Sequence, residues 1–199
     1  IETAIYTGTS MLNTVINMSG YKTGLLVNKG FEDILAQGRG SQTFIGAQWS
    51  EITHMQYRKH RIPLVPRKQA RGVTERIDMF GQVIIPMYED EVRQGIRELI
   101  VDEEVESIAI VFLQSYTNPQ HEIRAKEIAL EVMKELGQEV VLELSSQVAP
   151  TTREISRANA TVVQAYASDP ARKQLYRIEE ELTKTGYTHS LKTVLGYGG

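Results

Sequence analysis

The feature that most constrains the fold is a continuous apolar run from Ile108 to Leu113, in the middle of the chain. Six apolar residues without polar alternation are typical of a central strand that is covered on both faces. An amphipathic helical pattern precedes this run, over residues 90–100, and another follows it, over 119–136 and closed by Gly137. Strands that alternate with helices indicate a sheet with parallel strands, so the sequence predicts an α/β protein.

The same alternation is predicted toward both ends of the chain. The first forty residues predict β-α-β-α, with strands at 4–6 and 23–27, helices at 10–19 and 31–37, and Ser10 as the first N-cap. The last sixty predict a strand at 140–144, helices at 151–167 and 170–185 separated by Ser168-Asp169-Pro170, and a final strand at 191–195. Together these elements predict a mixed, mostly parallel sheet with flanking helices.

Two segments between these elements follow other patterns. Residues 39–62 show little periodicity and are expected to form a loop with one helical turn. Residues 69–77 alternate in type, 78–81 are a turn sequence, and 83–85 are β-branched. They predict a two-stranded ribbon with one side in water.

Composition excludes several classes of protein and site. The 199 residues carry a formal net charge of −3 with acids and bases interspersed, so no basic face indicates a nucleic-acid binder. No cysteine is present, which excludes disulfides and zinc–thiolate sites and favours a reducing, cytoplasmic location. No apolar run approaches the roughly 20 residues that cross a bilayer. The histidines lack metal-ligand spacing, and His121, near a helix start, is expected on the surface.

The two ends of the chain suggest a fragment of a larger protein. The sequence starts in β-branched residues with Ile1, and it stops on Gly196-Tyr-Gly-Gly199, directly after a predicted strand. Glycines after a strand let the backbone turn tightly or approach a ligand. We therefore expect further structure on both sides of this segment.

Three short segments are candidate ligand sites. The first is Gly8, Thr9 and Ser10, with Asn13 one turn later, where a strand leads into a helix; it predicts either an anion site or a simple N-cap. The second is Gly196, Gly198 and Gly199, where a ligand-facing turn and a plain glycine turn stay equally open. The third is Arg153, Glu154 and Arg157, which favours either a solvated helix end or a site in which an arginine faces an anion and Asn159 binds a ligand or partner.

Several runs in order resemble the hydantoinase A / 5-oxoprolinase / acetone carboxylase family. They are TGLLVNKGFEDILAQGR at 23–39, PLVP at 63–66, VTER at 73–76 with GQV at 81–83, SYTNPQHE at 115–122, LSSQV at 144–148, RE at 153–154, AY at 165–166 and the terminal GG. Each run is weak alone, but their order and spacing are specific. The runs at 71–81 and 153–157 are most similar to acetone carboxylase β-type subunits.

The resemblance implies an actin-like ATPase fold, of the Hsp70 and sugar-kinase type, that uses ATP and Mg²⁺ to phosphorylate a ketone, bicarbonate or amide oxygen. It implies a hydantoinase/oxoprolinase N-terminal region at 1–150 and the start of a core domain at 151–199. It also implies α-type and γ-type partner subunits, one of them carrying a metal. Gly8, Thr9 and Ser10 match the family's Gly-Thr-Thr, and Gly198-Gly199 match its closing Gly-Gly.

Two departures from the family pattern limit the transfer of roles. Leu12-Asn13-Thr14 stands where the family has Thr-Asn, and the acidic phosphate loop that precedes this region in the family is not in the sequence. The isolated segment is therefore expected to be inactive. Three hypotheses remain: part of an acetone carboxylase β-type subunit, part of a 5-oxoprolinase or N-methylhydantoinase that opens a cyclic amide, and an assembly module that holds partner subunits.

Overall fold

The computed structural model describes residues 3–37, 46–54, 56 and 63–194, and it divides the chain into two compact units. The first unit combines residues 1–20 with 167–199, and the second holds 21–166. Neither unit follows the predicted family regions 1–150 and 151–199, which are defined by sequence and stay a prediction. None of the described helices combines the length and apolarity that crossing a membrane requires.

The second unit is built on a four-stranded parallel sheet. Its strands are β2 (Thr23–Asn28), β3 (Ala70–Val73), β6 (Ser107–Val111) and β7 (Val141–Leu144), in the spatial order β3-β2-β6-β7. All three neighbouring pairs are parallel, which confirms the predicted fold class. Every residue of β2 and β6 is buried, as expected for central strands.

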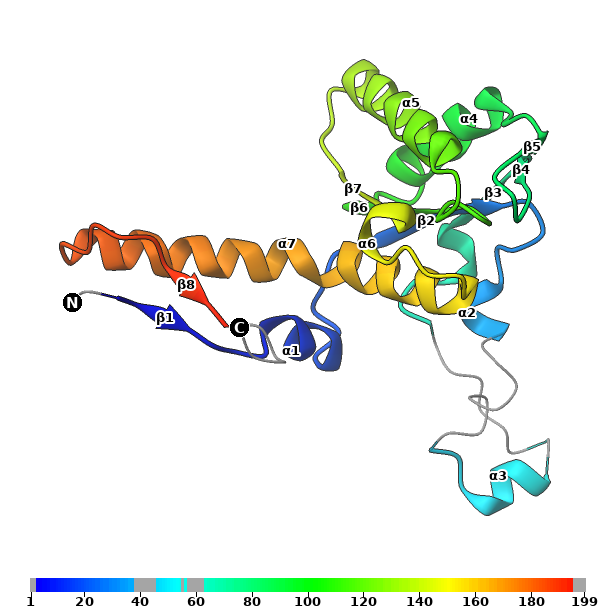
Figure 1. Ribbon diagram of the computed structural model, residues 1–199. Coiled ribbons are helices and arrows are strands. Elements are labelled where there is room, and N and C mark those ends of the chain that lie inside the picture. Colours follow the sequence, from blue (N-terminus) through cyan, green and yellow to red (C-terminus); the bar gives the residue numbers. More distant parts are fainter. Residues whose placement is uncertain (1–2, 38–45, 55, 57–62, 195–199) are drawn as a thin grey trace. The chain divides into compact units, whose positions relative to one another are not determined.

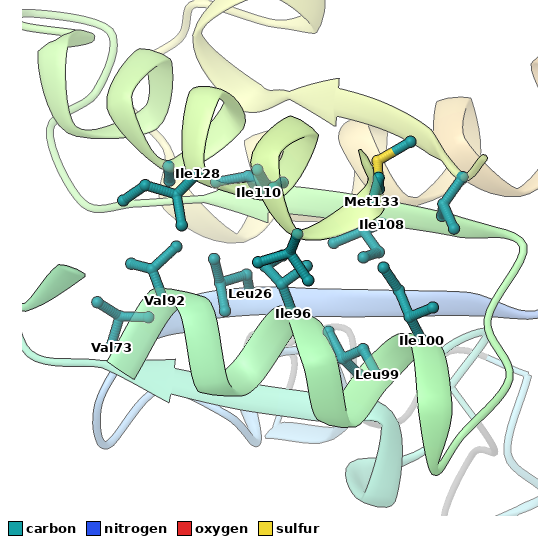
Figure 2. Close-up of a cluster of buried hydrophobic side chains, with 14 of the residues drawn as sticks. Leu26, Val73, Val92, Ile96, Leu99, Ile100, Ile108, Ile110, Ile128 and Met133 are labelled. Carbon is teal, nitrogen blue, oxygen red and sulfur yellow. The ribbon is translucent and has the colours of Figure 1, made fainter. Parts of the chain in front are cut away.

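Helices cover both faces of this sheet (Figure 1). On one face α4 (Glu89–Val101) and α5 (Gln120–Leu136) pack against Leu26, Ile108 and Ile110. Figure 2 shows how Val92, Ile96, Leu99 and Ile100 of α4 point at these strand residues, together with Ile128 and Met133 of α5. The helical periodicity of both segments is therefore explained by one apolar core.

The alternate strand residues, Leu25, Val27, Ala109 and Val111, face the other side of the sheet. They meet Ile34 of α2 (Ile34–Gln37) and three small or β-branched residues near the start of α7 (Glu154–Lys184): Ala158, Val162 and Ala165. The two central strands, β2 and β6, thus bury both of their faces, which explains the continuous apolar runs in their sequences.

The remaining elements of this unit are short. They are α3 (Trp49–Thr53), which confirms the predicted helical turn, the 3₁₀-helix η3 (Arg67–Gln69), β4 (Arg76–Ile77), β5 (Val83–Ile85) and α6 (Ser145–Val148). The predicted ribbon was partly wrong. Only β4 pairs with β5, while residues 70–73 join the main sheet as β3, parallel to β2.

The first unit contains β1 (Ile5–Tyr6), α1 (Ser10–Ile16), the later part of α7 and β8 (Lys192–Thr193). β1 and β8 form a two-stranded parallel pair, with Ile5 opposite Lys192. The predicted β-α-β-α order of the first forty residues is confirmed, but its two strands do not share a sheet, because β1 pairs with β8 and β2 belongs to the four-stranded sheet. Tyr187 fastens this pair: its hydroxyl accepts a hydrogen bond from the Ala4 amide at 2.8 Å and donates one to the Ser190 carbonyl at 3.3 Å.

Two helix boundaries differ from the predictions. Thr9, rather than Ser10, is the N-cap of α1, and no side-chain capping bond is formed there. The predicted break at Ser168-Asp169-Pro170 does not exist, since α7 continues through it with Pro170 inside the helix. The end of α5 agrees with the sequence: Gly137 closes that helix in the left-handed conformation, φ 64°, which glycine adopts without strain.

An ion pair between the sheet and α4 gives a pH-dependent contribution to stability. Arg71 of β3 donates from Nε to Glu98 at 2.6 Å, and Gln94 donates to the same carboxylate at 2.7 Å. The bond from Arg71, then that from Gln94, holds the pKa of Glu98 below its ordinary value. A depressed carboxyl pKa stabilises the fold above the unfolded pKa, and the gain is lost as the pH falls through the folded pKa.

We therefore expect Glu98→Gln to lower the free energy of unfolding by about 0.5–1 kcal/mol at pH 7, the range for partly exposed pairs. The difference from the parent protein should shrink to nothing under acid conditions, because protonation has then already removed the charge. Urea unfolding at a series of pH values measures this. Glu139→Gln, at an exposed position, is the control. A deficit that stayed constant down to the lowest pH would contradict the assignment.

Candidate functional site

The predicted site at Gly8, Thr9, Ser10 and Asn13 forms a polar hollow in the first unit. The hollow has a volume of about 380 Å³ and is lined by these four residues together with Tyr6, Thr14, Asn17, Ser19 and Gln174. The Ser10 hydroxyl donates to the side-chain oxygen of Gln174 at 2.5 Å. This bond ties α1 to α7, so two distant segments of the sequence line the same hollow.

The chemistry of this lining is neutral and rich in hydrogen-bonding groups. Hydroxyls and amides surround the hollow, and the described residues that line it include no lysine, arginine or carboxylate. Such groups can donate to the oxygens of a phosphate or a bicarbonate, but they do not neutralise its charge. Because Gly8 has no side chain, the Tyr6 side chain can lie close to it. A Cβ atom at position 8 would lie 2.7 Å from the Tyr6 hydroxyl oxygen.

The other two predicted sites do not contribute to this hollow among the described residues. Gly196, Gly198 and Gly199 lie outside the described residues, although the parallel pairing of β1 with β8 agrees with the geometry on which that prediction depended. Arg153, Glu154 and Arg157 belong to the second unit, so they are not grouped with the hollow. Arg153 is exposed, and so is Asn159, whereas Arg157 is buried.

Arg157 lies at the carboxyl ends of β6 and β7, in a buried polar network. Its guanidinium donates to the Phe112 carbonyl at 2.9 Å, to the Thr151 carbonyl at 2.7 Å and to the Ser145 hydroxyl at 3.1 Å. It also lies over the ring of Tyr116, 5.6 Å from the centroid. Burial lowers the pKa of Arg157, and the negative charge of Glu122 opposes that shift. The solvated-end interpretation of Arg157 was therefore wrong.

Glu122 is the acid of this network and is fully buried. Its carboxylate accepts from the Phe112 amide at 2.9 Å, the Ser146 amide at 2.9 Å and the Ser145 hydroxyl at 2.5 Å. Ser145 thus links the acid to Arg157, and it also pairs with the Ser115 hydroxyl at 3.0 Å. Because each of these groups has partners, the ends of two strands and the start of α7 are fixed to one another.

A second buried network surrounds the neighbouring residue, His121. Its Nδ1 lies 2.5 Å from Oε2 of Glu75, whose side chain is fully buried, and the other Glu75 oxygen accepts from the Asn28 amide. The Asn28 oxygen accepts from the Leu113 amide at 2.8 Å. The expectation of a surface His121 was wrong, because a carboxylate 46 residues away in sequence draws it inward.

This second network occupies the place where open α/β sheets usually hold ligands. The strand order reverses between β2 and β6, and ligands bind beyond the carboxyl ends of the strands at such a point. Here Asn28, at the end of β2, bonds to Leu113, just after β6. The ends of β2 and β6 are thus bridged by the protein's own side chains, and both networks hold the strand ends in place.

Sequence reasoning missed Asn28, Glu75, His121 and Glu122 as members of a site. A signal was present: Asn28 follows the apolar residues of one strand directly, and His121-Glu122 follow the central strand at the next helix start. Polar residues at the ends of parallel strands meet at one edge of the sheet. Among the described residues, no cluster of three or more His, Cys, Asp or Glu could hold a metal ion.

Comparisons with known proteins agree with this architecture. Residues 1–133 match the family described as the hydantoinase/oxoprolinase N-terminal region. The acetone carboxylase beta subunit of Xanthobacter autotrophicus is 36% identical over 199 residues, which is 100% of this chain and 28% of that protein. The acetophenone carboxylase gamma subunit of Aromatoleum aromaticum is 30% identical over 200 residues, 100% of this chain and 27% of its own length.

Solved structures show the same relationship. Nucleotide-free acetone carboxylase superimposes with a TM-score of 0.85 and 36% identity, covering 97% of this chain and 27% of the other. The ATP-dependent caprolactamase of Pseudomonas jessenii gives 0.75 and 27%, covering 96% and 26%. The chain therefore spans little more than a quarter of the relatives it matches. It belongs to the hydantoinase/oxoprolinase family and contains the N-terminal region of that family.

Proposed function

We propose that this chain works within a larger ATP-dependent subunit of the acetone carboxylase beta type, which activates a ketone and bicarbonate by phosphorylation so that they can be joined. The observation that carries the proposal is the 36% identity to the Xanthobacter beta subunit along all 199 residues. The alternative is ATP-dependent opening of a cyclic amide, which is favoured by the 38% identity to yeast 5-oxoprolinase over 85 residues.

The polar hollow is the part of this chain that we assign to ligand binding. The Thr9 hydroxyl and the side-chain amide of Asn13 would donate hydrogen bonds to oxygens of a phosphate or bicarbonate group, while the Ser10 hydroxyl, which donates to Gln174, holds one wall of the hollow. Catalysis of phosphoryl transfer consists mainly of positioning and charge stabilisation, which ATP-bound Mg²⁺ supplies together with such donors. Mg²⁺ binds phosphate oxygens and one or two carboxylates, and the neutral lining of the hollow leaves that carboxylate role to other residues.

Open surfaces in the first unit support a role inside a larger assembly. β1 and β8 pair only with each other among the described strands, and α1 buries none of its residues. Leu12 and Ile16 of α1 are 55% and 68% exposed. Because these relatives are named as carboxylase subunits, we propose that α-type and γ-type subunits are the partners of this protein in a cytoplasmic complex. An assembly role for this chain is compatible with that proposal.

The experiment that tests the function uses the whole enzyme, purified with its co-expressed partner subunits. ATP consumption is measured with acetone and bicarbonate together, with each alone, and with 5-oxoproline or N-methylhydantoin. Carboxylation predicts ATP use that requires both acetone and bicarbonate. ATP use with a cyclic amide and no bicarbonate would overturn the carboxylase assignment and establish the alternative.

A substitution in the hollow tests the proposed binding residues. In the whole enzyme, Asn13→Ala is expected to lower kcat/KM about 10- to 100-fold, since a lost hydrogen bond to a charged group costs about 1.5–3 kcal/mol. Ser156→Ala, at an exposed position of the second unit, is the matched control. Thermal unfolding should be unchanged in both variants. Normal kinetics in Asn13→Ala would exclude this residue from the site.

A further inference from the structure

Gly8 lines the polar hollow, yet its backbone conformation does not require glycine. Five of the described glycines have positive φ angles, and Gly8 is not among them, so another residue could adopt its conformation without left-handed strain. A side chain there is excluded for a different reason. The three atoms nearest to a Cβ at position 8 all belong to Tyr6: the hydroxyl oxygen at 2.7 Å and two ring carbons at 2.9 and 3.1 Å. Glycine at this position therefore provides space for one particular side chain.

The backbone of Tyr6 is fixed by the pairing of β1 with β8. Tyr6 lies opposite Thr193, and its carbonyl accepts a hydrogen bond from the Val194 amide at 3.3 Å. Its side chain is half-buried and lines the hollow together with Gly8. Because the hydroxyl oxygen is the Tyr6 atom nearest to a Cβ at position 8, the polar end of the ring lies beside the lining. A fixed strand thus presents a phenol hydroxyl at the hollow.

The Tyr6 hydroxyl is available to a ligand. It has no hydrogen-bond partner among the described residues, whereas the Tyr187 hydroxyl, in the same unit, makes two such bonds. A phenol hydroxyl can donate one hydrogen bond, and a donor to a charged oxygen makes a stronger bond than one to a neutral oxygen. Beside Thr9 and Asn13, Tyr6 would supply a third donor to the same ligand, from a different element of the fold.

We infer that Tyr6 is a ligand-binding residue of the hollow, that its hydroxyl donates to an oxygen of the bound oxyanion, and that Gly8 is glycine so that this hydroxyl can lie there. The inference rests on the proposed function, which assigns the hollow to a phosphate or bicarbonate group. No lysine or arginine is present among the described lining residues, so binding of a charged oxygen there depends on hydrogen-bond donors. Gly8 acts through Tyr6 and is a positioning residue.

Tyr6→Phe in the whole enzyme tests the binding role, because it keeps the ring and removes only the hydroxyl. The KM values for bicarbonate and for MgATP are measured separately, and the one that rises identifies the oxyanion. That KM should rise about 10- to 100-fold, the effect of one lost hydrogen bond to a charged group, while the other stays unchanged. Tyr176→Phe, at an exposed position of α7 in the same unit, is the matched control. A rise in neither KM, or an equal rise in both, would overturn the inference.

Gly8→Ala tests why glycine is present. The added Cβ must displace the Tyr6 hydroxyl, which is the far end of a side chain that can turn away, so we expect a folded variant in which the same KM rises. In the Tyr6→Phe background the substitution should add less than about threefold, because the hydroxyl is already gone. Full additivity would mean that Gly8 serves the ligand directly and would exclude the positioning role. If Gly8→Ala did not fold, Tyr6→Phe against Tyr176→Phe would still decide the role of Tyr6.

The substrate dependence of the parent enzyme is measured first, because it decides the proposed function alone. ATP use that requires a cyclic amide and no bicarbonate would exclude the carboxylase function and leave MgATP as the oxyanion substrate. Its KM in Tyr6→Phe would then decide the role of Tyr6. In an enzyme that requires both acetone and bicarbonate, normal KM values in Tyr6→Phe would contradict the role of Tyr6 and leave the carboxylase function in place.

Discussion

Replacing Arg157 with methionine is expected to lower the free energy of unfolding by about 3–5 kcal/mol, the cost of leaving a buried partner charge uncompensated. Methionine fills a similar volume, but it cannot donate to the Phe112 and Thr151 carbonyls or to the Ser145 hydroxyl. Buried Glu122 would then lose the guanidinium to which Ser145 links it. Urea unfolding followed by circular dichroism measures the loss.

The chain offers a matched control four residues earlier, just before α7 begins. Arg153 is exposed, and Arg153→Met should change stability by no more than about 0.5 kcal/mol, as surface substitutions usually do. A double-mutant cycle with Glu122→Gln separates the pair from its surroundings: Arg157→Met should cost less when the acid is already neutral. Equal losses for Arg153→Met and Arg157→Met would show that the network does not hold the strand ends.

The parts of the fold that sequence predicted well are those with strong local periodicity. β2, α4, β6, α5 and β7 were all expected within two residues of their observed bounds, because each buries a repeated apolar pattern in one of the two cores. The parallel pairing followed from the alternation of strands and helices. The local pattern did not predict that β1 pairs with β8, because these two strands lie near opposite ends of the sequence.

Two of the wrong predictions, a helix break and a strand pairing, have physical causes that lie elsewhere in the chain. Ser168-Asp169-Pro170 has the chemistry of a helix start, yet α7 continues through it because the Tyr21 amide takes the Tyr166 carbonyl that proline leaves free. Residues 70–73 alternate like a ribbon strand, but β2 offers them a free edge to pair with. In both places a long-range partner outweighed the local signal.

The same distinction between local pattern and long-range partners applies to the candidate site. Gly8, Thr9, Ser10 and Asn13 are close in sequence, so the strand-to-helix pattern sufficed to predict that they lie together, as they do. The addition of Gln174 depended on the packing of α7 beside α1. Polar residues in the second unit were judged exposed because burial of a charge requires a partner, and the partners of Arg157 and His121 come from distant segments.

The largest test of the second network is the replacement of His121 by alanine, which we expect to lower the free energy of unfolding by about 1.5–3 kcal/mol, the cost of a lost hydrogen bond to a charged group. Glu75 is fully buried, and without the imidazole one of its oxygens loses its partner, while Asn28 still donates to the other. Because Asn28 also binds the Leu113 amide, strain at Glu75 should spread to the junction of β2 and β6.

Thermal and urea unfolding of His121→Ala, compared with Gln120→Ala at the exposed neighbouring position, measure this cost. If the buried carboxylate is the reason for it, Glu75→Gln should rescue part of the loss, since a neutral amide is less costly to leave unpaired than a charge. Hydrogen exchange of the Leu113 amide should quicken in His121→Ala as the bridge to Asn28 loosens. A stable His121→Ala with unchanged Leu113 protection would mean that the strand ends are held by the Arg157 network alone.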